Sequence, residues 1–310
     1  ITRIGASVKQ PSSREHHLVP KGRCDQTSVS GRHARASRLM TKHIVDVLIE
    51  ERAERLMRSP SIWRWVKKYC FPLFYYRQAV ALVEEFKGAS AQKIMTDVAA
   101  NINLKLSVQG LGRVPVRGAA IVVANHPAGI ADGVALNAAL RQKRPDICFF
   151  ANRDAARCAP QLQDVIIPVE WAAARRSRAK SRETLKAISA AISNERLIVI
   201  FPSGRLAQPT LFGLRERPWA PSAVAIAQRH GLPIVPINIK ARNSLLYYLL
   251  FFCHTELKDL TLFRELLLPR QKRYQIRIGA LCQPGRDALL QTDRLYHHVV
   301  SRFSQSSGQP

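Results

Sequence analysis

Short apolar runs and stretches with helical periodicity alternate along the chain from about residue 104 onward. The runs at 119–124 and 197–201 consist of apolar residues, a pattern typical of buried strands, and Cys148 lies in a further predicted strand. Because helical stretches separate these strands, the pattern predicts an α/β fold in which helices flank a sheet.

The part of the chain before this sheet has helical periodicity. Apolar residues recur every three or four positions from Thr41 to about Lys87, and Ser59-Pro60 ends one predicted helix and begins the next. The second helix mixes aromatic rings with lysine and arginine. Such a mixture suits the headgroup layer of a bilayer, but it fits equally well a helix that covers the sheet. We therefore expect an N-terminal helical region at 40–103 that faces the membrane, with the covering role as the alternative.

A second membrane candidate is the run Leu245–Cys253, in which nine consecutive residues are apolar. Nine residues are too few to cross the ~30 Å hydrocarbon layer, which takes about 20 residues of helix. Partial immersion in one leaflet is therefore the expectation, and the alternative is a helical hairpin buried in the protein. The sequence thus predicts peripheral or monotopic attachment to a membrane.

Both ends of the chain lack the apolar periodicity of a packed domain. The first 39 residues contain eight Lys or Arg against two acidic residues, so a disordered basic tail is expected there. The first methionine is Met40, directly before the first helical pattern, and we expect the native start at or near it. With a disordered C-terminus at 304–310, the predicted organisation is a tail at 1–39, helices at 40–103 and a sheet domain at 104–303.

The first candidate for chemistry follows the apolar run 119–124. Asn125 and His126 begin a turn that contains a proline and a glycine, and Asp132 lies where a helical pattern begins. A neutral imidazole held by a carboxylate on one nitrogen can accept a proton on the other, as a general base does. The segment thus indicates activation of a hydroxyl group, with a simple helix-capping role for Asp132 as the alternative.

The second candidate is the turn that follows the apolar run 197–201. Its residues are Phe201, Pro202, Ser203, Gly204 and Arg205. Proline and glycine end the strand, and backbone N–H groups freed by such a turn, together with a guanidinium, suit a bound phosphate.

Together the two segments resemble a known family. In this order and about 75 residues apart, they are similar to the NHxxxxD and FPEGTR blocks of the glycerolipid acyltransferases, the PlsC-like lysophosphatidate acyltransferases, and most similar to the bacterial hemolysin-like and lyso-ornithine-lipid branch. Cys148–Arg153 and Leu232–Ile237 resemble the second and fourth blocks. The likeness covers roughly residues 40–303 and implies a mixed sheet flanked by helices, with the acyltransferase domain at 104–303.

Two departures from the family pattern concern the chemical segments. Five residues separate His126 from Asp132 where the family usually has four, so a wider turn must close the pair. Ser203 stands where most members have glutamate, and Arg205 comes one position earlier than the usual arginine. The sequence therefore leaves the acceptor headgroup open.

The resemblance implies transfer of an acyl chain from a thioester to a lysolipid hydroxyl. His126, oriented by Asp132, would take the hydroxyl proton while the oxygen attacks a thioester of acyl carrier protein or coenzyme A. Asn125 would position the turn, and Arg153 with the turn 201–205 would hold an acceptor such as lysophosphatidate or lyso-ornithine lipid. No cofactor besides the thioester substrate is implied, and no metal site is expected, because the sequence has no HExxH motif or paired Cys/His spacing. A non-catalytic protein that binds lipid or acyl chains is the alternative function.

The net charge of +26 points to an anionic partner. Part of this charge lies in the run Arg175–Arg182, for which a solvated helix face is the alternative interpretation. Membrane lipid is favoured because of the apolar run at 245–253, an acidic acyl carrier protein comes next, and nucleic acid is not expected because no nucleic-acid module is present. Six cysteines without a CxxC pair indicate buried, reduced thiols. We therefore expect attachment to the cytoplasmic face of the inner membrane.

Overall fold

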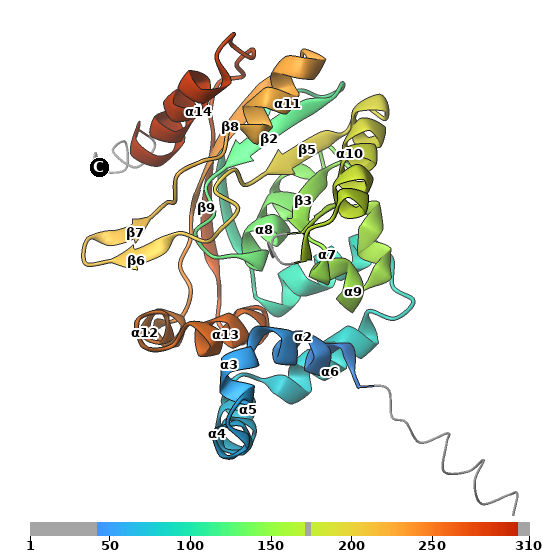
Figure 1. The fold of residues 1–310 in the computed structure, drawn as a ribbon. Coiled ribbons are helices and arrows are strands. Elements are labelled where there is room, and N and C mark those ends of the chain that lie inside the picture. Colours follow the sequence, from blue (N-terminus) through green and yellow to red (C-terminus); the bar gives the residue numbers. More distant parts are fainter. Residues whose placement is uncertain (1–41, 171–174, 303–310) are drawn as a thin grey trace, which may run out of the picture. The chain divides into compact units, whose positions relative to one another are not determined.

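The structure is a computed structural model that describes residues 42–170 and 175–302 (Figure 1). The tail predicted at 1–39 and the C-terminus predicted at 304–310 lie outside the described residues. All the helices and strands below belong to the compact unit that begins at His43.

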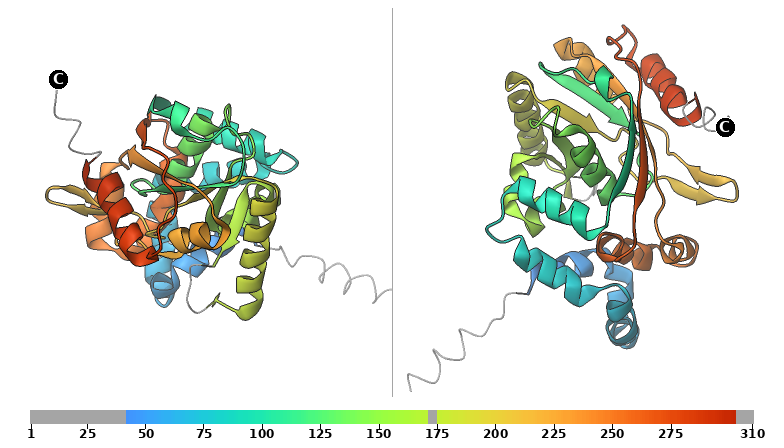
Figure 2. Two further views of the ribbon diagram at one scale, coloured as in Figure 1. Left: turned by 90° about the horizontal axis from the view of Figure 1, so that it is seen from above. Right: turned by 180° about the vertical axis from the view of Figure 1, so that it is seen from behind.

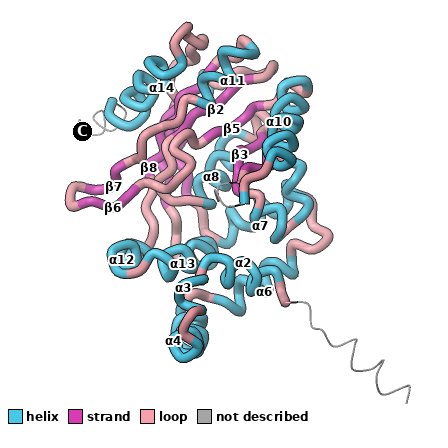
Figure 3. The backbone as a smooth tube through the Cα atoms, in the orientation of Figure 1, coloured by secondary structure: helices cyan, strands magenta, loops and turns pink. Residues whose placement is uncertain are grey.

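A seven-stranded sheet forms the centre of this unit (Figure 3). Its strands are β1 (Lys105–Gln109), β2 (Ala120–Ala124), β3 (Cys148–Asn152), β4 (Ile166–Val169), β5 (Leu197–Ile200), β8 (Ile234–Lys240) and β9 (Arg273–Ile278). They follow the order β1-β9-β8-β2-β5-β3-β4, and every neighbouring pair is parallel except the antiparallel pair of β8 and β9. The mixed sheet implied by the resemblance is thus confirmed.

Helices cover both faces of the sheet (Figure 2). They are α7 (Ala91–Asn101) and α8 (Ile130–Leu140) on one face, and α10 (Arg178–Ser193), α11 (Ser222–His230) and α14 (Ala288–His297) on the other. Side chains alternate along a strand, so in β2 Val122 packs with the first group of helices and Ile121 and Val123 pack with the second. A strand buried on both faces has no polar position, which is why apolar runs mark the strands in the sequence.

The helices that precede the sheet lie together with two helices that follow β8 (Figure 1). The first group is α2 (Ile44–Arg52), α3 (Glu54–Met57), α4 (Pro60–Trp65), α5 (Phe71–Leu73) and α6 (Tyr76–Glu85), and the second is α12 (Leu245–Cys253) and α13 (Thr255–Leu267). Leu260 of α13 is buried in one apolar cluster with Trp63 and Phe74. These helices therefore share a core with the later part of the chain, and α7 packs on the sheet itself.

The two N-terminal helices predicted from the sequence are instead a series of short segments. Pro60 does begin a new helix, as predicted, but α2 and α3 are also separated at Ala53, whose φ of −115° is not helical. One turn of π-helix, Val66–Cys70, joins α4 to α5, and α6 is preceded by Tyr75 in the left-handed region, with φ of 59°. The segments on either side of these breaks pack in one apolar cluster with α12 and α13, and a periodic apolar pattern does not reveal such contacts.

The segment from α4 to α5 has one buried side and one exposed side. One side is buried in the cluster with α13, and Trp63 is the largest side chain there. The other side leaves four large side chains about half exposed at helical spacing, namely Ile62, Trp65, Tyr69 and Leu73. The segment thus covers the core and also leaves an apolar stripe at the surface.

The apolar run predicted at 245–253 forms α12, which is neither wholly buried nor wholly exposed. Tyr247 is buried, whereas Leu245, Leu249 and Phe252 are 82%, 60% and 70% exposed. Their spacing of four and three positions places the exposed residues on one stripe of the helix. Within residues 42–170 and 175–302, no helix is long and apolar enough to cross a membrane.

The five cysteines within the described residues are free thiols. Cys70 and Cys148 are buried, and burial raises the pKa of the Cys148 thiol to about 11. Cys253, at the end of α12, is exposed, so the prediction of a buried thiol is wrong at this position. The reason is that the uniformly apolar run gives no sign of which residues face outward.

The basic run predicted at 175–182 leads into α10 and is partly neutralised within the protein. Arg175 pairs with Glu51 at 2.6 Å, and Lys180 pairs with Glu170 at 2.9 Å. Arg182 is exposed on α10. The run therefore combines internal ion pairs with a solvated helix face.

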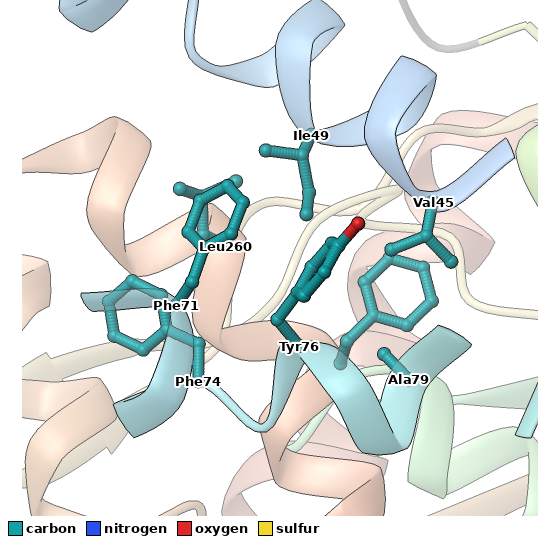
Figure 4. A pocket seen from close by; sticks show the side chains of 8 residues that line it. Val45, Ile49, Phe71, Phe74, Tyr76, Ala79 and Leu260 are labelled. Atoms are coloured by element: carbon teal, nitrogen blue, oxygen red, sulfur yellow. The ribbon is translucent and has the colours of Figure 1, made fainter. Parts of the chain in front are cut away.

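A small apolar hollow lies among the helices (Figure 4). It is lined by Val45, Ile49, Phe71, Phe74, Tyr76, Ala79, Leu260 and Phe263. The Tyr76 hydroxyl donates a hydrogen bond to Asp46 at 2.7 Å, so this polar group is satisfied. None of the lining residues belongs to the two predicted chemical segments.

An ion-pair network attaches α2 to the sheet through α9 (Asp154–Cys158), the short helix after β3. Glu51 accepts two hydrogen bonds from Arg157, each 2.8 Å long, and Arg52 donates to Asp154 at 2.7 Å. The hydrogen bonds from Arg157, opposed in part by burial, lower the pKa of Glu51 from 4.5 to about 2. The network therefore stabilises the fold when Glu51 is ionised.

We expect Glu51→Gln to lower the free energy of unfolding at pH 7 by about 1 kcal/mol, or the midpoint by about 2 °C. The effect is small because the Glu51 side chain is 32% exposed. The pKa of Glu51 is lower in the folded chain, so its stabilisation is full above about pH 4.5 and is lost as the pH falls toward 2. The unfolding midpoints of the wild type and Glu51→Gln, measured from pH 7 to pH 2, should therefore converge at acid pH. Glu54→Gln, at an exposed position, is the control, and curves that stay parallel would argue against the network.

Candidate active site

The two predicted chemical segments lie side by side because their strands are neighbours. His126 follows β2 and Phe201 follows β5, and these two strands pair in parallel. Parallel strands end at the same edge of a sheet, where ligands bind in many α/β proteins. The rings of His126 and Phe201 stack with centroids 4.2 Å apart and an angle of 22° between their planes.

The imidazole of His126 is held by Asp132. Its Nδ1 lies 2.9 Å from Oδ2 of Asp132, whose side chain is 0% exposed. A protonated Nδ1 donates in this hydrogen bond, which leaves Nε2 as the acceptor nitrogen. The His126 side chain is 16% exposed, and in the described part of the chain no group hydrogen-bonds to Nε2. The arrangement presents a basic nitrogen at the edge of the sheet.

The five residues between His126 and Asp132 include the first two residues of helix α8. Helix α8 begins at Ile130, so Asp132 lies in its first turn, and its Oδ2 accepts hydrogen bonds from the N–H groups of Ala128 and Gly129 at 2.9 and 3.0 Å. Gly129 has φ of +86°, and a Cβ there would lie 3.1 Å from the Leu206 side chain. Asp132 is therefore both the acceptor at the start of the helix and the partner of His126.

Asn125 fixes the turn to the neighbouring strand. Its amide Nδ2 donates to the carbonyl of Ile239 at 2.9 Å, and its Oδ1 accepts from the N–H of Ile239 at 2.7 Å. The side chain thus extends the pairing of β2 with β8 by one step and positions His126 through the backbone.

Glu216 is a buried carboxylate that the sequence analysis missed. It accepts a hydrogen bond from the His126 N–H at 3.1 Å and another from the Trp219 indole at 3.3 Å. Burial raises the pKa of Glu216, and the hydrogen bond from the His126 N–H opposes that effect. Its place between Arg215 and Arg217 suggests a surface charge, so no local signal marks it as part of the site.

Tyr274 of β9 is a second residue that the sequence analysis missed. Burial, and next the charge of Asp132, raise the pKa of Tyr274 well above its usual value. The Tyr274 hydroxyl and Oδ1 of Asp132 are both buried, and neither has a hydrogen-bond partner within the described residues. The charge of the carboxylate that holds His126 therefore opposes ionisation of this buried tyrosine.

The second turn presents one cation to solvent. Gly204 donates its N–H to the Phe201 carbonyl at 2.9 Å, and the Ser203 hydroxyl donates to the Arg205 carbonyl at 2.8 Å. Pro202 is buried. The Arg205 side chain is exposed and forms no ion pair with any residue in the ranges 42–170 and 175–302. Arg205 is therefore available to an anion.

The other predicted cation is already paired. Nη1 of Arg153 donates to both carboxylate oxygens of Glu183 on α10, at 2.8 and 2.9 Å. A role for Arg153 in binding a headgroup stays a prediction, and it requires this ion pair to open or to be shared.

Among the described residues, no cluster of three His, Cys, Asp or Glu side chains could hold a metal ion. The groups gathered at the sheet edge are an imidazole held by a buried carboxylate, a stacked aromatic ring and an exposed guanidinium. Such a set can take a proton from a hydroxyl and bind an anionic group nearby.

Residues 105–240, from the start of β1 to the end of β8, match the family model described as Acyltransferase. The chain is 25% identical over 184 residues to a lyso-glycine lipid O-acyltransferase of Phocaeicola vulgatus, and the match covers 57% of this chain and 64% of that protein. It is 21% identical over 197 residues to a lyso-glycine lipid O-acyltransferase of Bacteroides thetaiotaomicron, with 62% of this chain and 70% of that protein covered.

Among solved structures, a similar chain is the 1-acyl-sn-glycerophosphate (LPA) acyltransferase PlsC from Thermotoga maritima. The two share 13% sequence identity with a TM-score of 0.48, over 80% of this chain and 99% of that chain.

Proposed function

We propose that the chain is a member of the PlsC-like acyltransferase family and an O-acyltransferase that moves a fatty acyl chain from a thioester to the hydroxyl of a lysolipid. The match of residues 105–240 to the Acyltransferase family model and the similarity to two lyso-glycine lipid O-acyltransferases support this proposal. The observation that carries this proposal is the 2.9 Å contact between His126 Nδ1 and the buried Asp132. The donor is acyl carrier protein or coenzyme A, and the acceptor headgroup carries a phosphate or a carboxylate that Arg205 can bind.

In the proposed reaction, Nε2 of His126 removes the proton of the acceptor hydroxyl as its oxygen attacks the thioester carbonyl. The carbon–sulfur bond then breaks, the new ester remains on the lipid, and the imidazolium returns its proton to the departing thiolate. Asp132 stabilises the imidazolium between these steps because its charge lies 2.9 Å from Nδ1. Phe201 holds the ring against rotation by stacking on it.

The test is a transfer assay on the purified full chain. Acyl carrier protein and coenzyme A carrying the same labelled acyl chain are each mixed with lysophosphatidate, lyso-ornithine lipid or lyso-glycine lipid. We expect acylated lipid, identified by mass spectrometry, and free thiol in equal amounts with at least one pair. Binding of lysolipid without product would instead support the non-catalytic lipid-binding function.

We expect Arg205 to contact the acceptor and not the donor. Arg205→Ala should raise the KM for the lysolipid about 10-fold or more and leave the KM for the thioester nearly unchanged, because a charge-assisted contact contributes roughly 1.5–3 kcal/mol. Steady-state kinetics with each substrate varied in turn measures both constants.

Arg229→Ala, which removes an exposed arginine at the far end of α11, is the matched control for loss of charge. A change confined to the thioester KM would assign Arg205 to the donor.

We further propose that the protein attaches to the cytoplasmic face of the inner membrane without crossing it. Its support is the pair of exposed apolar stripes, on α12 and on the segment from α4 to α5. The charge of +26 adds attraction to anionic lipid.

Replacing Leu249 and Phe252 by Glu should move the protein from the membrane to the soluble fraction, because two charged side chains then stand where apolar side chains would contact the acyl chains of the lipid. Both side chains are largely exposed in the fold, so the unfolding midpoint should stay close to that of the wild type. Cell fractionation and thermal unfolding measure the two effects.

The paired control places Glu at Leu289 and Leu290, exposed leucines of α14, and should leave the protein on the membrane. High salt should strip the wild type only partly, since apolar immersion is not screened. Complete release by salt alone would remove the case for immersion.

A further inference from the structure

The β6–β7 hairpin carries an unusually exposed apolar tip. Strands β6 (Gln208–Thr210) and β7 (Gly213–Arg215) pair antiparallel outside the main sheet. The tip between them consists of Leu211 and Phe212, which are 98% and 101% exposed. No described residue covers either side chain, and such a pair is costly to leave in water.

The base of the hairpin is attached to the backbone of His126 at both ends. Ala207, just before β6, donates its N–H to the His126 carbonyl at 2.9 Å. Glu216, just after β7, accepts the His126 N–H at 3.1 Å. The hairpin is therefore an arm that extends from the catalytic turn itself, and the position of its tip is coupled to the position of the imidazole.

The tip lies on the same side of the unit as the two apolar stripes. In Figure 1 the β6–β7 turn is at the left, α12 lies below it and α4 is at the bottom. In the view from behind in Figure 2 the turn is at the right, with α12 again below it and α4 at the bottom. The three elements that carry these exposed apolar side chains therefore lie toward one side of the unit.

The charge of the arm fits an anionic lipid surface. From Arg205 to Arg215 the chain contains two arginines and no acidic residue, and both arginines are exposed. An apolar tip flanked by cations is the composition of an interfacial anchor, whose rings and leucines enter the acyl boundary while the cations meet the headgroups.

We infer that the β6–β7 hairpin is a lipid-inserting arm: Leu211 and Phe212 enter the leaflet that contains the acceptor, and the hairpin holds the His126 turn at the depth of the acceptor hydroxyl. Insertion by itself does not depend on the proposed acyl transfer. The consequence for catalysis does rest on that function.

Binding of the full chain to vesicles of phosphatidylcholine with 30 mol% phosphatidylglycerol tests the insertion. Leu211→Ser with Phe212→Ser should weaken cosedimentation about 10- to 100-fold, since two large apolar side chains no longer leave water. Leu185→Ser, at a 61% exposed leucine of α10, is the matched control and should bind as the wild type does. Equal binding of the tip variant and the wild type would overturn the inference.

A tryptophan variant tests insertion directly, without relying on a loss of vesicle binding that could have an indirect cause. Phe212→Trp should acquire fluorescence that brominated acyl chains quench beyond the wild-type background, whereas Leu185→Trp should not. Absence of added quenching at position 212 would overturn insertion. So would a tip variant that changes a concentration-dependent dimer in sedimentation while vesicle binding is unchanged, because the tip would then contact a second copy of the chain.

Kinetics separate this inference from the proposed function. In the variant with Leu211→Ser and Phe212→Ser, kcat/KM should fall about 10-fold or more for a lysolipid presented in vesicles. It should stay unchanged for a short-chain lysolipid dissolved as monomer. If both fall equally, the arm acts on the catalytic turn and not through lipid. If the wild type binds vesicles through the tip but transfers no acyl group, insertion stands and the proposed acyltransferase function fails.

Discussion

His126→Ala is expected to lower acyl transfer by about 10²–10⁴-fold, which brings it to background in most assays. A base that takes the hydroxyl proton in the transition state contributes this much, whereas a residue that merely orients the substrate contributes less. His126 is suited to the role because Nδ1 is held at 2.9 Å by a fully buried carboxylate, which leaves Nε2 to accept a proton. The product of labelled thioester and lysolipid measures the rate.

Two controls accompany His126→Ala. Vesicle binding and the unfolding midpoint should change little, because the backbone groups of His126 that bind Ala207 and Glu216 are retained. His230→Ala, at an exposed histidine that ends α11, should keep full activity. A rate within about tenfold of the wild type would show that the imidazole is not the base.

Asp132→Asn is expected to lower the rate by about 10²-fold or more with little loss of thermal stability. The amide keeps the size of the carboxylate, and its oxygen can still accept from the N–H groups of Ala128 and Gly129. What is lost is the charge that stabilises the imidazolium and selects the tautomer with its proton on Nδ1. Transfer kinetics and thermal unfolding on the same preparation separate the two effects.

The pair of variants discriminates between mechanisms. Near-normal turnover in Asp132→Asn, with none in His126→Ala, would mean that another group orients the imidazole of His126. The nearby carboxylate of Glu216 contacts only the backbone N–H of His126. Near-normal turnover in both variants would refute the proposed mechanism altogether.

The sequence was a good guide wherever local pattern determines structure. The apolar runs located the central strands, because a strand covered on both faces admits no polar residue. The two chemical turns were placed together through their resemblance to family blocks, and their contact follows from the parallel pairing of β2 with β5.

Features that depend on contacts between distant parts of the chain could not be predicted from the sequence. Glu216 meets His126 across 90 positions, and Tyr274 approaches Asp132 from a strand near the end of the chain. The breaks in the N-terminal helices likewise reflect packing on α12 and α13. The β6–β7 hairpin was missed because its strands are three residues long and carry no alternation.

The order of strands in the sheet also has a consequence for synthesis on the ribosome. Strand β9 lies between β1 and β8, so β1, among the first sheet residues to emerge, has no neighbour until residues 273–278 have been made. Until then β8 presents an open edge, which is prone to pairing with other chains. Tyr274 arrives with this last strand, so the nascent chain completes its sheet and the surroundings of Asp132 in one late, long-range step, typical of slow folding.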